Sequence, residues 1–304
     1  MTQADCLNPH ICDTVSNLAS VYAHAEPFRH LVIDDFLARD FADALLREFP
    51  AFEKGNNLGD DGKPGNKSTF ERIQNLGAAY RNLDQLVKSA EFLQLIGNIT
   101  GIDDLLYDPF YLGGGTHENR HGQSLHPHVD FNYHPSEGWH RRLNLIVYLN
   151  HDWEDAWGGN LELYKDPYSD PSPAHRIAPR FNRCVIFETT ESSWHAFDRI
   201  QLPDAVGRTR KSIALYFYSK ERPARETAGK HTTHYVNRQI PAHILPGYAL
   251  RPDDVALLQE IVRDRDELLQ RLYAENAALR QAQDRGFSGK ILYLLKRLYV
   301  RFRK

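Results

Sequence analysis

Cysteine is scarce in this chain, and its spacing excludes one large class of proteins. The 304 residues include only three cysteines, Cys6, Cys12 and Cys184, which form neither an even-numbered set nor a Cys-x-x-Cys pair. Small secreted domains that depend on disulfides need a denser and more regular set. The pattern therefore predicts free thiols in a reducing compartment.

Long apolar runs and a strong charge of one sign are also missing. No stretch approaches the roughly 18 apolar residues of a membrane span, and residues 1–20 lack the basic start and apolar core of a signal peptide. The formal net charge of -3 gives the chain as a whole no electrostatic footprint for nucleic acid. We therefore expect a cytoplasmic protein with no nucleic-acid partner.

The apolar residues that are present suffice for a large core. They make up 41% of the chain, against 25% charged residues, which allows one or two domains. Leu31–Phe36 is predicted as a strand, and Ala38–Phe49 and Leu83–Ile99 as helices. From Tyr107 to Tyr218 short apolar segments recur between turn residues, as in a sandwich or small barrel. We predict an α+β fold: a double-stranded β-helix (jelly-roll) core with packed helices and a C-terminal helical extension.

The most informative motif is His128-Val129-Asp130, followed on a later predicted strand by His195. Side chains two residues apart on a strand project from the same face, so His128 and Asp130 are placed to bind one ion together. With His195 they form the 2-His-1-carboxylate facial triad, which leaves three coordination positions of Fe(II) open for a co-substrate and O2. His126 has the same phase on the strand and remains an alternative ligand to His128.

A second pattern lies in Arg208–Lys220, which alternates like a β-strand. One face carries Arg210 and Ser212, whereas the opposite face is mainly apolar. A guanidinium matches a carboxylate with two parallel hydrogen bonds. The strand therefore predicts a site that anchors a dicarboxylate, and the alternative is an exposed strand arginine.

The order of these motifs resembles the Fe(II)/2-oxoglutarate dioxygenases, particularly their prolyl 4-hydroxylase-like branch. His-x-Asp is followed by a strand ending Tyr-Leu-Asn, then Gly-Gly, a strand ending in Phe, a His and Arg-x-Ser, and the likeness covers the chain from Phe28 to Lys220. One departure is Asn182, which stands where the family's turn usually has glycine. Asparagine tolerates positive φ better than most residues, so we expect the turn to survive.

The resemblance implies that six residues of this chain hold the reactants: His128, Asp130 and His195 for Fe(II), and Arg210, Ser212 and Tyr148 for 2-oxoglutarate, with Arg210 on its distal carboxylate. It also implies that O2 is consumed and that a C–H bond of a peptide, sugar or small molecule is hydroxylated, with succinate and CO2 as further products. Ascorbate as an additional reductant is compatible with this reaction.

Several other residues carry weaker signals. Glu53–Lys67 is rich in Gly, Asn and Asp and is interpreted as a mobile loop, either a surface excursion or a lid. Tyr133, Trp139 and Trp157 are candidates for the mouth of the site, although aromatic residues are more often part of a core. Five further histidines lie in loop-like sequence and are expected at the surface: His117, His121, His134, His140 and His151.

The C-terminal part has a different pattern. Pro252-Asp253-Asp254 is a helix start signal, and it is followed by apolar residues at heptad-like positions, namely Leu258, Ile261, Leu268, Leu272 and Leu279. Lys290–Lys304 combines basic and apolar side chains without an acidic residue. The heptad-like spacing predicts that this helix either associates with a second copy or packs against the core of its own chain. The tail predicts peripheral contact with the inner face of a membrane, or with an acidic protein chain.

We predict four segments: an N-terminal segment (residues 1–27), the oxygenase jelly-roll domain with its N-terminal helices (28–220), a connector (221–252), and a helical, coiled-coil-like extension with a basic amphipathic tail (253–304). The rival hypothesis is a non-catalytic jelly-roll metal-binding or scaffold protein. Its C-terminal helices would attach it to a membrane or a polysaccharide-assembly complex. Arg210-x-Ser212 favours the enzyme, because a structural metal site does not require this pair.

Overall fold

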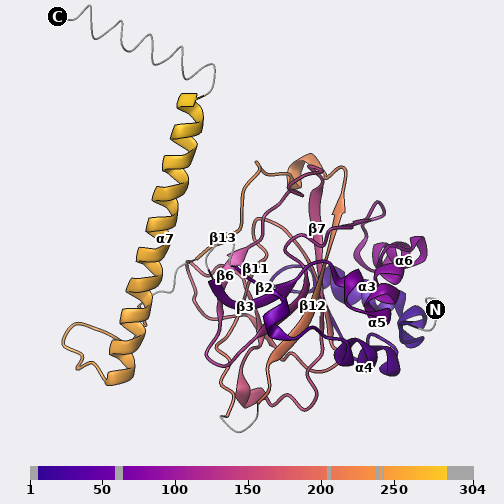
Figure 1. Ribbon diagram of the computed structural model, residues 1–304, viewed down its shortest axis with the longest axis horizontal. Coiled ribbons are helices and arrows are strands. Elements are labelled where there is room, and N and C mark those ends of the chain that lie inside the picture. The colour runs from indigo at the N-terminus through magenta and orange to yellow at the C-terminus, as the bar shows by residue number, and fades with distance from the viewer. Residues whose placement is uncertain (1–5, 59–63, 204–206, 237–239, 242, 286–304) are drawn as a thin grey trace, which may run out of the picture. The chain divides into compact units, whose positions relative to one another are not determined.

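The computed structural model describes residues 6–58, 64–203, 207–236, 240–241 and 243–285 (Figure 1). The chain forms two compact units, Met1–Val236 and Asn237–Lys304. The first unit contains all described strands, and the second contains helix α7 (Pro252–Arg285), which begins where the start signal predicted. Within the described ranges, no helix has the length and apolarity that a bilayer span requires. The predicted basic tail, Lys290–Lys304, lies outside the described residues.

The helices of the first unit gather on one side of the larger sheet, to the right of β7 and β12 in Figure 1. They are α2 (His10–Asp13), α3 (Val15–His24), α4 (Arg39–Arg47), α5 (Ala78–Val87) and α6 (Ala90–Thr100). The first unit also has the 3-10 turns η1 (Phe52–Lys54), η2 (Ile73–Asn75), η3 (Asp155–Trp157) and η4 (Ala224–Glu226). The prediction of one helix over Leu83–Ile99 is wrong, because Ser89 caps a second helix by accepting a hydrogen bond from Phe92 N at 3.2 Å.

The larger sheet has the strand order β1-β10-β7-β12-β5-β3-β2, with β4 paired to β12. Its members are β1 (His30–Ile33), β2 (Asn56–Leu58), β3 (Pro64–Phe70), β4 (Leu106–Tyr107), β5 (Gly115–Asn119), β7 (His140–Tyr148), β10 (Cys184–Glu188) and β12 (Arg210–Ser219). The smaller sheet has the order β13-β6-β11-β8-β9, formed by β6 (Leu125–Val129), β8 (Leu161–Tyr164), β9 (His175–Ile177), β11 (Trp194–Phe197) and β13 (His234–Tyr235).

The two faces of β7 and β12 bury different sets of side chains. Leu145 and Leu215 belong to the main core, which the helices share, together with Leu143, Val147, Ile213 and Phe217. On the opposite face, Tyr148 of the larger sheet belongs to a second apolar cluster with Leu163 of the smaller sheet. The sheets therefore face each other as in a jelly roll. The predicted α+β fold is confirmed, as is the assignment of faces to β12.

One segment, Glu53–Lys67, differs from what its composition predicted. Within Glu53–Lys67, residues 56–58 form β2 and residues from Pro64 onward form β3, which pairs with β5. Backbone pairing at a sheet edge thus outweighs the turn-rich composition. Leu7, Ile11 and Tyr22, from the N-terminal segment, are buried in the main core. The first compact unit extends past Lys220 to Val236, while the four predicted segment boundaries remain predictions.

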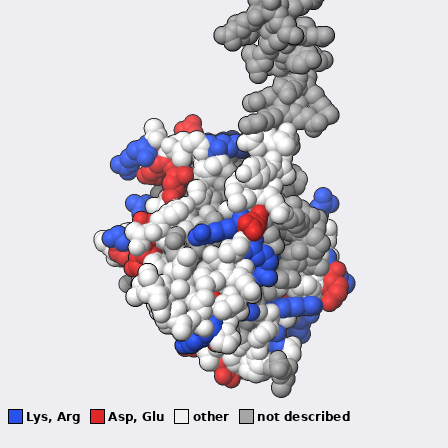
Figure 2. Space-filling view, turned by 90° about the vertical axis from the view of Figure 1, so that its left-hand side faces the viewer, with Lys and Arg blue, Asp and Glu red and all other residues white. Residues whose placement is uncertain are grey.

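Charges on the face drawn in Figure 2 are mixed. Lys and Arg side chains lie among Asp and Glu side chains and wide uncharged areas. The described residues on this face therefore form no field of one sign.

Asn182 fixes the turn that leads into β10. Its φ is 58°, so the turn expected at this position survives with asparagine in the left-handed region. Its Oδ1 accepts a hydrogen bond from Leu37 N at 2.9 Å, and its Nδ2 donates to Leu37 O at 2.7 Å. The side chain is 1% exposed. Asn182 therefore ties this turn to the start of α4 with two buried bonds.

Replacing Asn182 separates its two contributions. Asn182→Gly keeps the backbone conformation but leaves both buried groups of Leu37 unpaired, so we expect the free energy of unfolding to fall by about 2–4 kcal/mol in urea titrations. Asn182→Ala should lose a further 1 kcal/mol or so through the left-handed strain. Asp35→Gly is the matched control, since Asp35 is exposed with φ of 51°. A glycine variant at 182 as stable as this control would refute the clamp.

Candidate metal centre

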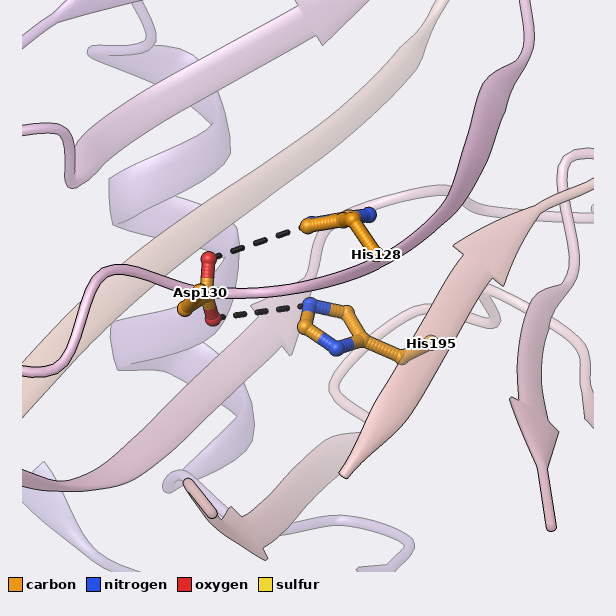
Figure 3. A group of neighbouring side chains, drawn as sticks. All are labelled: His128, Asp130 and His195. Atoms are coloured by element: carbon orange, nitrogen blue, oxygen red, sulfur yellow. Dashed lines mark ion pairs between the residues drawn. The ribbon is translucent and has the colours of Figure 1, made fainter. Parts of the chain in front are cut away.

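Pairing between β6 and β11 brings the ligand motif together. His195 lies directly opposite His128 in the antiparallel register, so both rings project from the same face of the smaller sheet. Asp130 follows β6 immediately and turns its carboxylate toward both rings (Figure 3). Within the described part of the chain these three residues are the group placed to hold a metal ion, and His126 is not part of it.

The distances fit a single ion. His128 Nε2 lies 3.8 Å from Asp130 Oδ1, and His195 Nε2 lies 3.5 Å from Asp130 Oδ2. One ligand atom from each residue lies within 4.8 Å of the others. Atoms each about 2.0–2.2 Å from one metal are separated by distances of this order. Two nitrogens and one carboxylate oxygen match the donor set of a non-haem Fe(II) site.

Both histidines are held in the tautomer that a metal needs. His128 Nδ1 lies 2.8 Å from His126 O, and His195 Nδ1 lies 2.9 Å from Ser193 O. Because a carbonyl only accepts, each Nδ1 carries the hydrogen and each Nε2 keeps its lone pair for the metal. Burial lowers the pKa of His128 to about 3 and also lowers the pKa of His195. Both rings are therefore neutral ligands at physiological pH.

Asp130 is held ionised by neighbours that the sequence analysis did not identify. Burial alone would raise its pKa, but the guanidinium of Arg141 brings that pKa below its ordinary value. Arg141 Nη2 lies 3.1 Å from Asp130 Oδ2, and Asn144 Nδ2 donates to the same oxygen at 2.7 Å. Two donors therefore occupy Oδ2, which leaves Oδ1 as the oxygen for a metal.

A β-bulge explains why Arg141 was missed. The register of β7 against β12 shifts at Arg142, which is the extra residue. In a regular strand Arg142 would share a face with Asn144, but the shift gives this place to Arg141, which donates to Asn144 Oδ1 at 2.7 Å from Nη2. Asn144 itself left a signal, since it is a polar residue in the apolar run Leu-Asn-Leu-Ile-Val.

Arg210 is a buried cation without a buried anion. It is 5% exposed, its Nε donates to Gly159 O at 2.7 Å, and its Nη2 lies 3.4 Å from the Tyr148 hydroxyl. No carboxylate among the described residues forms an ion pair with it, and burial lowers its pKa. Ser212 lies opposite Tyr148 on the neighbouring strand, so these side chains share the face of Arg210. Such a site fits one carboxylate of 2-oxoglutarate.

The remaining candidates are placed as follows. The Tyr133 hydroxyl donates to Ala228 O at 3.2 Å, and the Trp139 ring lies 5.6 Å from the ring of His134. Trp157 belongs to a separate buried cluster with Trp153. Neither the position of Trp139 nor that of Trp157 gives a contact with the triad.

The surface prediction for His134 is wrong. His134 is 0% exposed, and its Nδ1 accepts the amides of Ser136 and Glu137 at 3.3 and 3.1 Å. Its Nε2 therefore carries the hydrogen and faces Asp108 Oδ1 at 3.4 Å. The ring fills the loop that follows Asp130, which loop-like sequence alone does not reveal. Of the other four histidines, His121 is exposed, and the rest are half-buried: His117, His140 and His151.

Known proteins of similar sequence point to the same kind of site. Residues 114–218 match the model of the 2OG-Fe(II) oxygenase superfamily. The prolyl 3-hydroxylase OGFOD1 of Mus musculus is 24% identical over 229 residues, which cover 68% of this chain and 36% of that protein. The chain thus spans little more than a third of the length of this curated relative.

Two solved structures share the fold. A prolyl 4-hydroxylase from Phytophthora capsici aligns with a TM-score of 0.50 at 20% identity, covering 89% of this chain and 77% of that one. A prolyl hydroxylase from Trichoplax adhaerens, in complex with a peptide fragment of the hypoxia inducible factor oxygen degradation domain, aligns with a TM-score of 0.50 at 16% identity. Here the alignment covers 70% of this chain and 94% of that one.

Removing the Arg210 charge should separate ligand binding from stability. In Arg210→Met we expect the affinity for 2-oxoglutarate, measured by calorimetry with Mn(II) present, to fall at least a hundredfold, because two charge-assisted hydrogen bonds are lost. The unliganded variant should be at least as stable as the wild type, since an unpaired buried charge is gone. Arg208→Met is the control, and Arg208 is exposed. Equal losses of affinity in both variants would contradict the assignment.

Proposed function

We propose that this chain is a 2OG-Fe(II) oxygenase of the prolyl 4-hydroxylase-like branch and that it hydroxylates a C–H bond of an organic substrate. The observation that carries the proposal is the convergence of His128, Asp130 and His195 within reach of one ion. Fe(II) and 2-oxoglutarate, when bound, supply the oxidising chemistry with O2, and succinate and CO2 are the further products.

The protein's own groups prepare the site for this chemistry. The two histidines present neutral Nε2 atoms, and Arg141 and Asn144 keep Asp130 ionised and oriented. Arg210 supplies a fixed cation for the distal carboxylate of the co-substrate. Because Asp130 provides a carboxylate at the third ligand position, a halide has no vacant place there, which favours hydroxylation over halogenation.

For the substrate we propose a prolyl residue within a peptide. The named relatives are prolyl hydroxylases, and one of them is described in complex with a peptide fragment.

The reaction is tested by 2-oxoglutarate turnover. Wild-type protein with Fe(II) should form succinate when incubated with proline-containing peptides, and the peptide product should gain the mass of one oxygen. His128→Ala should lower succinate formation by at least a thousandfold, because the metal loses a ligand. His126→Ala is the matched control and should retain activity. Full activity of the alanine variant at 128 would refute the proposal. Turnover with sugars or small metabolites alone would refute the peptide substrate.

We also propose that α7 pairs with the α7 of a second copy. Of the predicted heptad positions, Leu272 is 48% exposed, whereas Ile261 is buried. The exposed apolar residues spaced by seven are instead Val255, Val262 and Leu269, at 39%, 58% and 49%. A heptad stripe of this kind is the seam of a coiled coil. A long helix also gains most of its stability from packing of its apolar face.

Cytoplasmic location and membrane contact through Lys290–Lys304 are proposals that rest on the sequence.

A charge in the stripe should break this pairing. Sedimentation velocity of the wild type at tens of micromolar should give a dimer, and Val262→Glu with Leu269→Glu should give a monomer, because two carboxylates per helix would enter the apolar seam. The control is Arg263→Glu, which introduces an acidic side chain at an exposed position off the stripe. A monomeric wild type at this concentration would exclude self-association.

A further inference from the structure

After β12 the chain turns back along the smaller sheet. Residues 228–236, here called the strap, bind the loop between β6 and β7. Asn132 Nδ2 donates to Gly229 O at 2.8 Å, and its Oδ1 accepts a hydrogen bond from His231 N at 3.0 Å. His231 Nε2 also lies 3.0 Å from Glu191 Oε1. The strap is therefore anchored to the segment that directly follows the metal ligands.

The strap ends as β13, an edge strand paired with β6. Tyr235 lies directly opposite His128, and cross-strand partners in an antiparallel pair project from the same face. The neighbouring residue, His234, points to the other face, where its Nε2 lies 2.8 Å from the Tyr168 hydroxyl. One strand thus carries an aromatic ring on the side of the metal site and an anchor on the outer side.

The Tyr235 ring stacks on the ring of His128. The ring centroids are 5.1 Å apart with 30° between the planes, and Tyr235 is half-buried. The bond from His128 Nδ1 to a backbone carbonyl fixes its tautomer and restrains rotation about the Cβ–Cγ bond. The Tyr235 ring, packed against the face of the imidazole, adds a second restraint on this rotation. His195 contacts the same imidazole, with centroids 4.2 Å apart.

We propose that Tyr235 is a positioning residue of the metal site, which it holds in order through His128. The proposal rests on the proposed function, because it assigns a role at the same site. A residue that supports a ligand from outside the coordination sphere typically changes metal affinity by ten- to a hundredfold. Tyr235, which follows the last strand of the jelly roll in the sequence, thereby supports the metal site.

Metal affinity tests the proposal without any turnover. In titrations of Mn(II) followed by the EPR signal of the free ion, Tyr235→Leu should bind about tenfold more weakly than the wild type, because the aromatic face is lost. Tyr235→Phe keeps the ring and should restore wild-type affinity. With Co(II) as the probe, the visible absorption bands of Tyr235→Leu should shift relative to the wild type, since they report ligand geometry.

His234→Ala is the matched control on the same strand. It removes the outer anchor and leaves the ring on His128, so Mn(II) affinity should stay within twofold of the wild type. Wild-type affinity and spectrum in Tyr235→Leu would overturn the proposal. Equal weakening in Tyr235→Leu and His234→Ala would also overturn it, because strap attachment rather than the ring would then be responsible. Neither result touches the proposed function, which is tested separately by succinate formation in the wild type and its loss in His128→Ala.

Discussion

Antiparallel pairing of β6 with β11 is the constraint on which the rest of the site depends. His128 and His195 are far apart in the sequence, and this pairing makes them direct cross-strand neighbours on one face. The carboxylate of Asp130, at the end of β6, then lies within 4 Å of both rings. A shift of one residue in this register would turn His195 to the outer face of the sheet, and the three side chains would no longer converge. The smaller sheet therefore sets the positions of the three candidate ligands.

The buried charges around the site have unequal partners. Asp130 is paired with Arg141 and supported by Asn144, so the carboxylate is held even without a metal. Arg210 has a backbone carbonyl and a tyrosine hydroxyl, and no carboxylate of the described chain is paired with it. Burying an unpaired cation costs stability, and functional sites commonly carry such a cost. The carboxylate of a bound co-substrate would pair with Arg210 and offset this cost.

Much of this arrangement could be predicted from the sequence, because alternation along a strand is a local property. Alternation placed His128 with Asp130 and Arg210 with Ser212, and the order of motifs carried the family resemblance. Features that depend on pairing with distant segments were not predictable. The bulge that puts Arg141 beside Asp130, the burial of His134 and the strands within Glu53–Lys67 all arise from tertiary contacts. The break at Ser89 was missed for another reason, since a local cap outweighed a continuous apolar pattern.

The central claim is that one ferrous ion is held by His128, Asp130 and His195. Its most direct test is a crystal structure of the full chain, grown anaerobically with Fe(II) and 2-oxoglutarate, with anomalous data collected at the iron edge. The account predicts a single strong anomalous peak about 2.0–2.2 Å from both Nε2 atoms and from Asp130 Oδ1. It also predicts a carboxylate of the co-substrate on the Arg210 guanidinium. A peak centred on His126, or iron without contact to His195, would contradict it.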